Sequence, residues 1–546
     1  MKIKKKPLNQ RTKSLFVVLS GFLTVVLIVS GVFCYQFFTR VGFSSTGEHL
    51  LANELQDKID VLPYFKDGHI YYYENGNKTL IAQNVYDPTA EDPVLSADYA
   101  IDKTTGKMLY ISNGSLFLYN GNTVKIADNV TSWRTSKEMR SISFTTPWHN
   151  SSDRGTLFLY RDGEITPVDT DVVNATVRFS QNGEYVFYEK PNSYPQIRSK
   201  LFKYSVLNEK TVVHETSFPV LWVNDDGSQL ITGENIDDGL YSYRLFTNNL
   251  KKQKVFDNVY YSDVTDDKSI LYMLCDYDYD AYSGTLVAVD LKTLKTKELA
   301  KNVSFFDISV VTDASKGVVY SIETDSENGY YSIYFSDISG NSTRLIHNTV
   351  EDSLYNVIVN TDLMEGYVLS LGATKMDGGV YSIKWDKNKL VTKRLAAGNV
   401  DNLIYYEKTH SVTFIKNADE DGAELYFTDF SGNLRLLSQN CGVQYQNGTQ
   451  TYQSSSVFST KTGKTMYFTD IISGKTTVDT SGTLYIDDTL ISENVSSGFM
   501  EAPLTDKNFS QVFFLKKQNE KMDLYLYNGQ DTVLIDENVQ GLIQLT

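Results

Sequence analysis

Short runs of apolar and aromatic residues, bounded by Gly, Asn or Asp, fill most of the chain beyond residue 60. Runs of this length and composition predict β-strands. Outside the apolar segment at residues 14–38, no helical period of comparable length appears, apart from a short candidate at residues 48–57. Six runs are especially rich in Tyr, Phe or Leu: residues 116–119, 157–160, 331–334, 381–385, 425–427 and 524–527.

A short sequence motif recurs just after these runs, and we call it the Asn-Val phrase. It consists of an apolar pair, one or two further residues and Asn-Val. From Asn84 to Asn538 it spans 454 residues, or ten steps averaging about 45. Weaker copies occur at residues 348–350 and 440–441, and degenerate ones are expected near Val172 and Ser217. The clear copies end at Asn84-Val85, Asn129-Val130, Asn258-Val259, Asn302-Val303, Asn399-Val400, Asn494-Val495 and Asn538-Val539.

Each period also contains a turn followed by a strand, as at residues 104–107, 180–184, 224–228 and 461–464. Asn-Gly and Asp-Gly supply the positive φ angles that a tight hairpin needs. A less regular strand follows each Asn-Val. Four short antiparallel strands in about 45 residues are typical of one β-propeller blade. The sequence therefore predicts an all-β array of about eleven blades.

The number of blades bears on how the array closes. Single rings usually hold about four to eight blades, so we expect two rings, residues 61–300 and 301–546, dividing near residues 290–303. The first unit is expected to begin at its third strand, HIYYYE, within residues 67–76. A final strand at residues 541–546 is expected to complete that first sheet and remove an open edge.

The segment Ser180-Gln181-Asn182-Gly183-Glu184-Tyr185-Val186-Phe187 resembles the Ser-x-Asp-Gly-Lys hairpin of the WD40-like repeats in TolB-type β-propellers. The resemblance covers about residues 60–546. It implies a propeller architecture, and this fold hosts binding proteins and enzymes alike.

The N-terminal part predicts a membrane anchor. Residues 14–38, from Ser14 to Phe38, form 25 uncharged positions, enough to cross a lipid hydrocarbon core as a helix. Residues 1–13 carry six Lys or Arg and no acid, so we expect this tail in the cytoplasm and everything after Arg40 outside, beginning with the juxtamembrane segment 39–60. Tyr35, Phe37 and Phe38 favour an uncleaved anchor over a signal peptide, and Phe33 argues against lipidation at Cys34.

Charge limits the class of partner. Seven of the 51 basic residues and none of the 67 acidic residues lie in the first 40 positions, which leaves 44 against 67, a formal charge of −23. Nucleic acid is therefore not expected as a partner, because phosphate binding needs clustered Lys and Arg. Beyond the anchor only Cys275 and Cys441 occur, and their spacing leaves open whether they pair.

Motifs of catalysis are missing: the sequence has no G-x-S-x-G, H-E-x-x-H, C-x-x-C pair or phosphate-binding Gly loop. Two oxygen-rich clusters are calcium candidates, although each lacks the Glu expected at the twelfth loop position. The alternative is that both are solvated hairpins. The candidate ligands are Asp276, Asp278, Asp280, Asn417, Asp419 and Asp421. No other cofactor is expected.

By resemblance, the loops joining second to third strands and those joining fourth strands to the next first strand gather on the binding face of a propeller. Exposed aromatics and carboxylates there suit sugars, peptides or cationic groups. The same aromatics are alternatively part of blade packing. The residues expected on this face are Trp148, His149, Tyr277, Tyr279 and Tyr282.

These features favour a non-catalytic binding or scaffolding protein at the cell surface, with a protein, peptide or glycan partner outside the cell and membrane lipid around residues 14–38. One alternative is an extracytoplasmic hydrolase or lyase acting on carbohydrate, because such chemistry needs only two carboxylates held several ångströms apart. A third is an accessory protein of envelope assembly. Composition is typical of a bacterial surface protein.

Overall fold

A computed structural model describes residues 58–543, apart from 87–97, 103–104, 149–150, 181, 192–198, 206–209, 218–219, 238–239, 248, 326–329, 351–356, 371–377, 387–388, 399, 420–421, 442–443, 447–448, 452–456, 473–480, 497–501 and 519–520. The expected anchor, tail and residues 48–57 lie outside this part. Within it no helix has the length and apolar character needed to cross a membrane.

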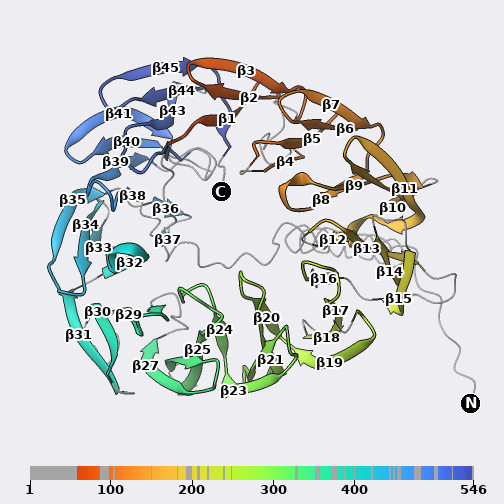
Figure 1. Ribbon diagram of the computed structural model, residues 1–546. Coiled ribbons are helices and arrows are strands. Elements are labelled where there is room, and N and C mark those ends of the chain that lie inside the picture. Colours follow the sequence, from red (N-terminus) through yellow and green to blue (C-terminus); the bar gives the residue numbers. More distant parts are fainter. Residues whose placement is uncertain are drawn as a thin grey trace, which may run out of the picture. The chain divides into compact units, whose positions relative to one another are not determined.

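The described residues form antiparallel sheets and no α-helix, which confirms the all-β prediction. Nine sheets have four strands each, and one larger sheet joins two further sets of four through a single pair, Val495 with Lys516. We call each set a blade and number the blades 1 to 11 in chain order. Figure 1 shows their first strands nearest the centre and their fourth strands outermost.

The strands of blades 1 to 4 are β46 (Gly541–Leu542), β1 (Val61–Lys66), β2 (His69–Glu74) and β3 (Asn77–Ala82); β4 (Tyr99–Ile101), β5 (Met108–Ser112), β6 (Ser115–Tyr119) and β7 (Thr123–Ala127); β8 (Ser132–Thr135), β9 (Ile142–Trp148), β10 (Ser151–Arg161) and β11 (Glu164–Val173); and β12 (Arg178–Phe179), β13 (Tyr185–Pro191), β14 (Ser199–Ser205) and β15 (Lys210–Ser217).

The strands of blades 5 to 8 are β16 (Val220–Val223), β17 (Leu230–Asp237), β18 (Leu240–Thr247) and β19 (Lys252–Val259); β20 (Tyr261–Val264), β21 (Ile270–Asp278), β22 (Ser283–Asp290) and β23 (Thr296–Val303); β24 (Phe305–Asp307), β25 (Gly317–Asp325), β26 (Tyr330–Asp337) and β27 (Ser342–Val350); and β28 (Val357–Asn360), β29 (Glu365–Ser370), β30 (Gly379–Asp386) and β31 (Lys389–Ala397).

The strands of blades 9 to 11 are β32 (Val400–Tyr406), β33 (Ser411–Asp419), β34 (Gly422–Asp429) and β35 (Arg435–Cys441); β38 (Val457–Phe458), β39 (Thr465–Ile472), β40 (Ser481–Ile486) and β41 (Thr489–Ser496); and β42 (Leu504–Thr505), β43 (Val512–Gln518), β44 (Lys521–Tyr527) and β45 (Thr532–Asp536). A separate hairpin pairs β36 (Gln444–Gln446) with β37 (Thr449–Thr451), and short 3-10 turns are Lys137–Met139, Asn174–Thr176 and Glu407–Thr409.

The Asn-Val phrase has a definite backbone role. Asn302 adopts φ 56° in an irregular stretch of β23, where the register shifts between the pairs of Gly284 with Val303 and Leu286 with Ala300. Asn tolerates this left-handed conformation better than most residues, and a β-bulge needs it. Val303 is fully buried. Asn84, Asn129, Asn258, Asn494 and Asn538 repeat the positive φ, and Asp171 before buried Val172 is the degenerate copy predicted there.

The hairpin between first and second strands is equally regular. In blade 4 the Ser180 hydroxyl oxygen accepts a hydrogen bond from the Tyr185 amide, 3.0 Å away. Four other blades have the same bond: a side-chain oxygen at the start of the turn accepts a hydrogen bond from the backbone amide five positions later. The accepting residues are Ser136, Asn224, Thr265 and Asp506. One polar side chain therefore fixes this turn even where the Gly is missing, as after Thr265.

Buried hydrophobic clusters join every blade to the next. Blades 6 and 7 share a cluster that includes Leu286 and Phe306, and blades 11 and 1 share one that includes Phe513 and Tyr64. Comparable clusters join the other neighbours in chain order. Within the compact unit Gly47–Thr546 the blades therefore form one closed ring (Figure 1).

This closure corrects two expectations. The predicted division near residues 290–303 into two rings is wrong, because that segment contributes β23 to blade 6 and its apolar side chains pack in the cluster shared with blade 7. HIYYYE is the third strand of its blade, as predicted, but the blade begins one strand earlier at β1. The expected closing strand is confirmed: β46 pairs with β1, Leu542 opposite Tyr64 and Gly541 opposite Phe65.

Candidate functional site

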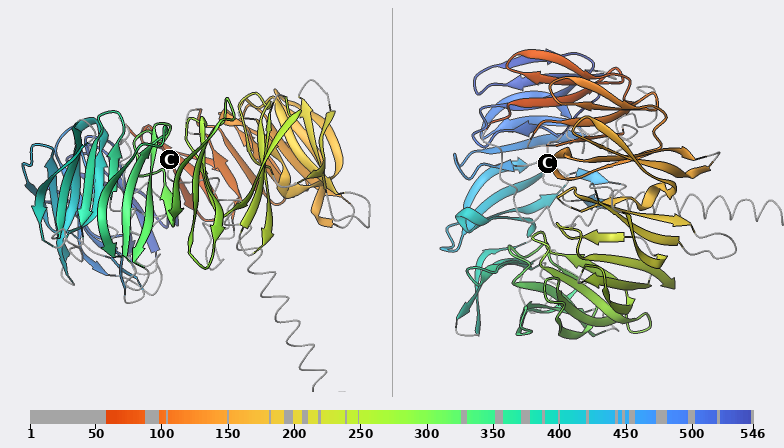
Figure 2. Two further views of the ribbon diagram at one scale, coloured as in Figure 1. Left: turned by 90° about the horizontal axis from the view of Figure 1, so that it is seen from below. Right: turned by 45° about the vertical axis from the view of Figure 1, so that its right-hand side comes forward.

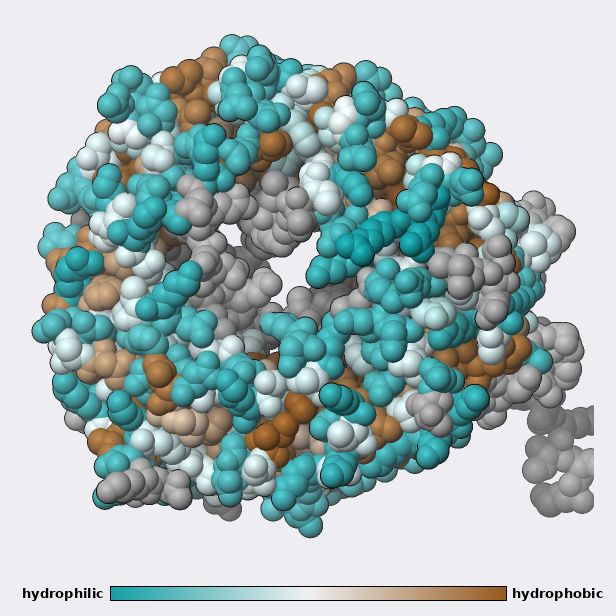
Figure 3. Space-filling view, viewed as in Figure 1, coloured by the Kyte–Doolittle hydropathy of each residue, from teal (hydrophilic) through white to brown (hydrophobic). Residues whose placement is uncertain are grey.

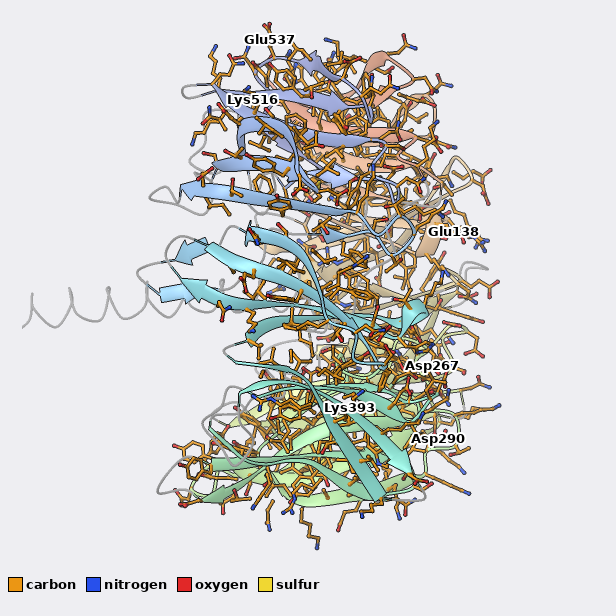
Figure 4. All side chains as sticks on the ribbon, turned by 90° about the vertical axis from the view of Figure 1, so that its left-hand side faces the viewer. Glu138, Asp267, Asp290, Lys393, Lys516 and Glu537 are labelled. Carbon is orange, nitrogen blue, oxygen red and sulfur yellow. The ribbon has the colours of Figure 1, made fainter. Side chains whose placement is uncertain are left out.

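Connections in each blade gather at two ends. Because the four strands are antiparallel and consecutive, the hairpin between second and third strands lies at the same end as the start of the first strand and the end of the fourth. We call this the 2–3 end, and the opposite one the 1–2 end. Figure 2 shows the unit edge-on with its hairpins along both faces, and Figure 4 shows Glu138, Asp267 and Asp290, from hairpins of the 1–2 end, along one side.

Tyrosines cluster at the 2–3 end of blade 6. Tyr260, between β19 and β20, stacks on Tyr277 of β21, with ring centroids 3.9 Å apart and planes 13° apart. Tyr279 meets both rings edge-on, with centroids 5.3 Å from Tyr277 and 6.0 Å from Tyr260. Tyr282 and Tyr331 lie near enough to Tyr277 to affect its titration. We call these five residues the tyrosine cluster.

The tyrosine cluster is open to solvent. Tyr260, Tyr279 and Tyr282 have 37%, 38% and 65% of their surface exposed, whereas the other Phe, Tyr and Trp side chains of the described residues are buried or half-buried. Partial burial of Tyr277, together with the surrounding phenols, raises its pKa to about 12, so its hydroxyl stays neutral at physiological pH. Tyr277, Tyr279 and Tyr282, the three tyrosines predicted on the binding face, all belong to the cluster. Tyr260 and Tyr331 are its other two members.

The acidic residues beside the cluster cap a turn. Asp278 Oδ1 accepts from the amides of Asp280, at 2.8 Å, and Ala281, at 3.3 Å. Asp276 is exposed and has φ 50°. Among the described residues no three acidic, His or Cys side chains gather to hold a metal ion, so Asp276, Asp278 and Asp280 form no such group.

The second calcium candidate is described only in part. Asn417 is exposed, and its Nδ2 donates to Glu424 Oε2 at 2.9 Å. The side chain of Asp419 and the whole of Asp421 lie outside the described residues. Calcium binding by this hairpin stays a prediction.

Trp148 lies at the end of β9, in the 2–3 hairpin of blade 3, and is partly exposed. It shares the 2–3 end with the tyrosine cluster but belongs to a blade three positions earlier in the ring. His149 lies outside the described residues. The structure therefore brings Tyr277, Tyr279 and Tyr282 together and does not bring Trp148 to them.

Two carboxylates lie buried in the same pair of blades. Asp263 of β20 and Asp307 of β24 stand on first strands of blades 6 and 7, and each is 6% exposed. Burial, together with the charge of Asp307, raises the pKa of Asp263 to about 7 although the Val264 amide donates to it. Burial also raises the pKa of Asp307, whose Oδ1 accepts from the amide and hydroxyl of Ser309 while Oδ2 has no partner among the described atoms.

Both cysteines of the ring are free thiols. Cys275 and Cys441 are buried in blades 6 and 9 and are not bonded to each other. Burial raises the pKa of Cys275 to about 12 and that of Cys441 to about 11, so neither thiol forms the reactive thiolate near neutral pH.

Sequence reasoning missed Tyr260, Tyr331, Asp263 and Asp307. A usable signal existed for Tyr260, since it directly follows Asn258-Val259 and so occupies the connection that ends at the 2–3 end. The sequence predicts Tyr331 only as a strand residue, within residues 331–334. Asp263 and Asp307 carry no local motif, because their pairing depends on two strands 44 positions apart that meet only when neighbouring blades pack.

Comparison with known proteins gives no family. No protein-family model matches the chain, and no curated protein matches it. Similar solved structures include a eukaryotic initiation factor, at 8% identity and TM-score 0.37, with 89% of this chain and 97% of that chain covered.

Peptidases also appear among the similar structures. A prolyl endopeptidase matches at 14% identity and TM-score 0.29, with coverage of 72% of this chain and 58% of that one. An acylaminoacyl peptidase of Pyrococcus horikoshii matches at 14% identity and TM-score 0.26, with coverage of 57% and 52%. The chain thus spans just over half the length of these peptidases, and likenesses this weak assign no activity.

Proposed function

We propose that the protein is a non-catalytic binding or scaffolding protein, held in a cell membrane by residues 14–38 with its ring of blades outside. The observation that carries the proposal is the tyrosine cluster, which brings five phenols from three separate segments to one blade junction and leaves Tyr260, Tyr279 and Tyr282 exposed. Tyr side chains offer large, rigid contact surface at low entropic cost, and they are enriched where proteins bind partners.

The surroundings of the cluster favour a polar partner. Asp276, Asp278 and Asp280 flank it, so the surface combines ring faces with carboxylates. Stacked aromatics with hydrogen-bonding neighbours suit a glycan or a peptide carrying cationic groups. The opposite face of the ring, its 1–2 end, is the face seen in the space-filling view of Figure 3, and it is largely hydrophilic, as suits an aqueous compartment.

We also propose that the chain belongs with the TolB-type propellers. Support comes from the hairpin of Ser180, in which side-chain and backbone hydrogen bonds hold the turn, and from the same bonding pattern in four other blades. The segment Ser180–Phe187, whose sequence resembles the hairpin of these repeats, thus also forms a hairpin turn between β12 and β13.

The catalytic alternative has one observation in its favour, the pair Asp263 and Asp307 on neighbouring first strands. Burial raises the pKa of both carboxyls, and neighbouring carboxyls with a raised pKa occur in many acid–base sites. Against it stands the exposure of only 6% for each side chain, which leaves a substrate little access. The binding function is therefore favoured.

Photo-crosslinking in the native envelope tests the proposal. A benzophenone amino acid at Tyr282 of the full-length chain should capture a partner on irradiation, because this position is 65% exposed within the cluster. The matched control is the same probe at Leu434, which is 43% exposed near the 1–2 end of blade 9. Identical products from both positions, or none from Tyr282, would contradict the proposal.

A further inference from the structure

A cavity opens between blades 9 and 10 at the 1–2 end, away from the tyrosine cluster. Its volume is about 370 Å³. The 3-10 turn Glu407–Thr409, the turn before β35 and the hairpin between β38 and β39 bring its walls together. Lining residues include Thr409, Phe427, Asn433, Arg435, Phe458 and Thr460. Cavities of about 300–1,000 Å³ are the usual size for small-molecule sites.

Arg435, the first residue of β35, is the only charged side chain in this lining. Its guanidinium carbon lies 5.2 Å from the ring centroid of Phe427 and 5.7 Å from that of Phe458. The two rings are themselves 5.1 Å apart. The guanidinium also approaches Gly463 of blade 10, because a Cβ added to that glycine would lie 3.9 Å from both terminal nitrogens of Arg435. Two rings and a glycine thus orient the planar group.

Arg435 is exposed, so its guanidinium donors are open to a ligand from solvent. Within the described part of the chain its guanidinium makes no hydrogen bond or ion pair, whereas Arg140 and Arg154 pair with carboxylates. No carboxylate lines the cavity. The nearby Asp429 is engaged by the amide and hydroxyl of Ser431, which lower its pKa, and Lys393 of blade 8 donates to the Ser431 carbonyl.

The geometry points to a binding site for a small ligand that carries a carboxylate or phosphate group. A guanidinium presents a rigid fork of N–H donors that matches both groups, and it binds them more tightly when it is oriented beforehand. Thr409, Thr460 and Asn433 add polar groups around it, and the two Phe rings offer apolar contact to the rest of the ligand. In a ring with many more acids than bases, a cationic cavity without acids is a local exception.

Calorimetric titration of the purified full-length chain tests this site with three probes: benzoate, phenyl phosphate and the neutral benzamide. We expect an anion to bind and benzamide not to. Arg435→Gln should weaken anion binding by about 10- to 100-fold, the range for loss of a charged hydrogen bond. Arg435→Lys should lose less, because it keeps the charge without the fork. Tighter binding of benzoate would indicate a carboxylate ligand, and tighter binding of phenyl phosphate a phosphate ligand.

The matched control is Arg344→Gln, an exposed Arg opposite Tyr334 on the outer strand of blade 7. This variant should bind the anions as the unaltered chain does. The thermal midpoint of each variant checks folding, and Arg435→Lys keeps the test decisive if Arg435→Gln unfolds. The inference is overturned if neither anion binds, if benzamide binds equally well, or if binding survives both substitutions at Arg435. The site lies apart from the tyrosine cluster, so this result is independent of the proposed function.

Discussion

The hydroxyl of Tyr64 donates a hydrogen bond to Oδ2 of Asp536 over 2.8 Å, although 472 positions separate the two residues. Lys66 Nζ lies 2.7 Å and Lys78 Nζ 3.3 Å from Oδ1 of the same carboxylate, whose side chain is 8% exposed. One aspartate of blade 11 therefore gathers three side chains of blade 1. It adds a polar bond to the junction that closes the ring.

Asp536→Asn should destabilise the ring. The substitution removes the charge that Lys66 and Lys78 face, and a hydrogen bond to a charged group contributes about 1.5–3 kcal/mol. Burial raises the pKa of Asp536, but hydrogen bonds from Lys66 and Tyr64 outweigh it, and the net pKa is lowered. The stabilisation is therefore present above the ordinary Asp pKa of about 4 and is lost as pH falls through the lower folded pKa.

Thermal unfolding measures this effect when it is followed from about pH 2 to about pH 7, a range that covers the titration of Asp. The difference between the unaltered chain and Asp536→Asn should be largest near neutral pH and vanish in acid. Asp531→Asn, on an exposed turn of the same blade, is the control and should change little. An equal loss for both variants would show that Asp536 has no special role in closure.

The pair Asp263 and Asp307 should have the opposite pH dependence. Because burial raises the pKa of Asp263 to about 7, the folded state holds a proton that the unfolded state releases near pH 4. Stability from this group is thus full below about pH 4 and declines as pH rises toward 7. Asp263→Asn keeps a neutral side chain, so it should raise stability at pH 8 by an amount on the order of 1–3 kcal/mol and flatten the decline.

Urea unfolding at pH 5 and pH 8 compares the variant with the unaltered chain. A stabilisation at pH 8 that shrinks at pH 5 is the expected result. If Asp263→Asn destabilises the ring equally at both pH values, the folded state needs the charged carboxylate at both. The pKa of Asp263 would then not be raised in the folded state.

The Asn of the repeated phrase should resist replacement by Ala. At Asn302, φ is 56°, and an ordinary residue in the left-handed region costs about 1–2 kcal/mol. Asn302→Ala should lower the free energy of unfolding by about that amount, whereas Asn302→Gly should cost less because Gly adopts this angle freely. Equal effects of both variants in denaturant unfolding would mean that side-chain contacts of Asn302, and not its backbone angle, explain the repeat.

The stack of Tyr260 on Tyr277 should contribute to stability as a pair. Stacked aromatic pairs contribute about 0.5–1.5 kcal/mol beyond their buried area. A double-mutant cycle with Tyr260→Ala and Tyr277→Ala should give a coupling of that size in denaturant midpoints. Tyr241 and Tyr243, whose rings stack at 5.9 Å in blade 5, provide a comparison pair. Additive effects at Tyr260 and Tyr277 would indicate that the rings contact each other without stabilising the blade.

Much of the fold could be predicted because it is local and repeated. Asn302-Val303 combines a left-handed residue with a buried one, and this combination recurs since every outer strand needs the same bulge before the chain enters the next blade. The turn at Ser180 is similar, because one side chain and one amide five residues apart fix it. Such features leave a mark in the sequence wherever they occur.

The way the ring closes could not be predicted in the same way. The number of blades in one ring depends on the angle at each shared cluster, such as the one between Leu286 and Phe306, and no single residue encodes that angle. The sites follow the same rule. Tyr277, Tyr279 and Tyr282 are neighbours in sequence and were predicted, whereas Tyr331 and the pair Asp263 and Asp307 come together only through packing between blades.

Strand β46 has a consequence for biosynthesis. Blade 1 consists of three strands that precede every other blade in the sequence and one, Gly541–Leu542, that follows them all. Until the ribosome has released those residues, β1 presents an unpaired backbone edge to its surroundings. Every product that terminates before Gly541 carries that open edge as well, so a protease or chaperone that recognises exposed strands can distinguish a chain that lacks β46 from one that has it.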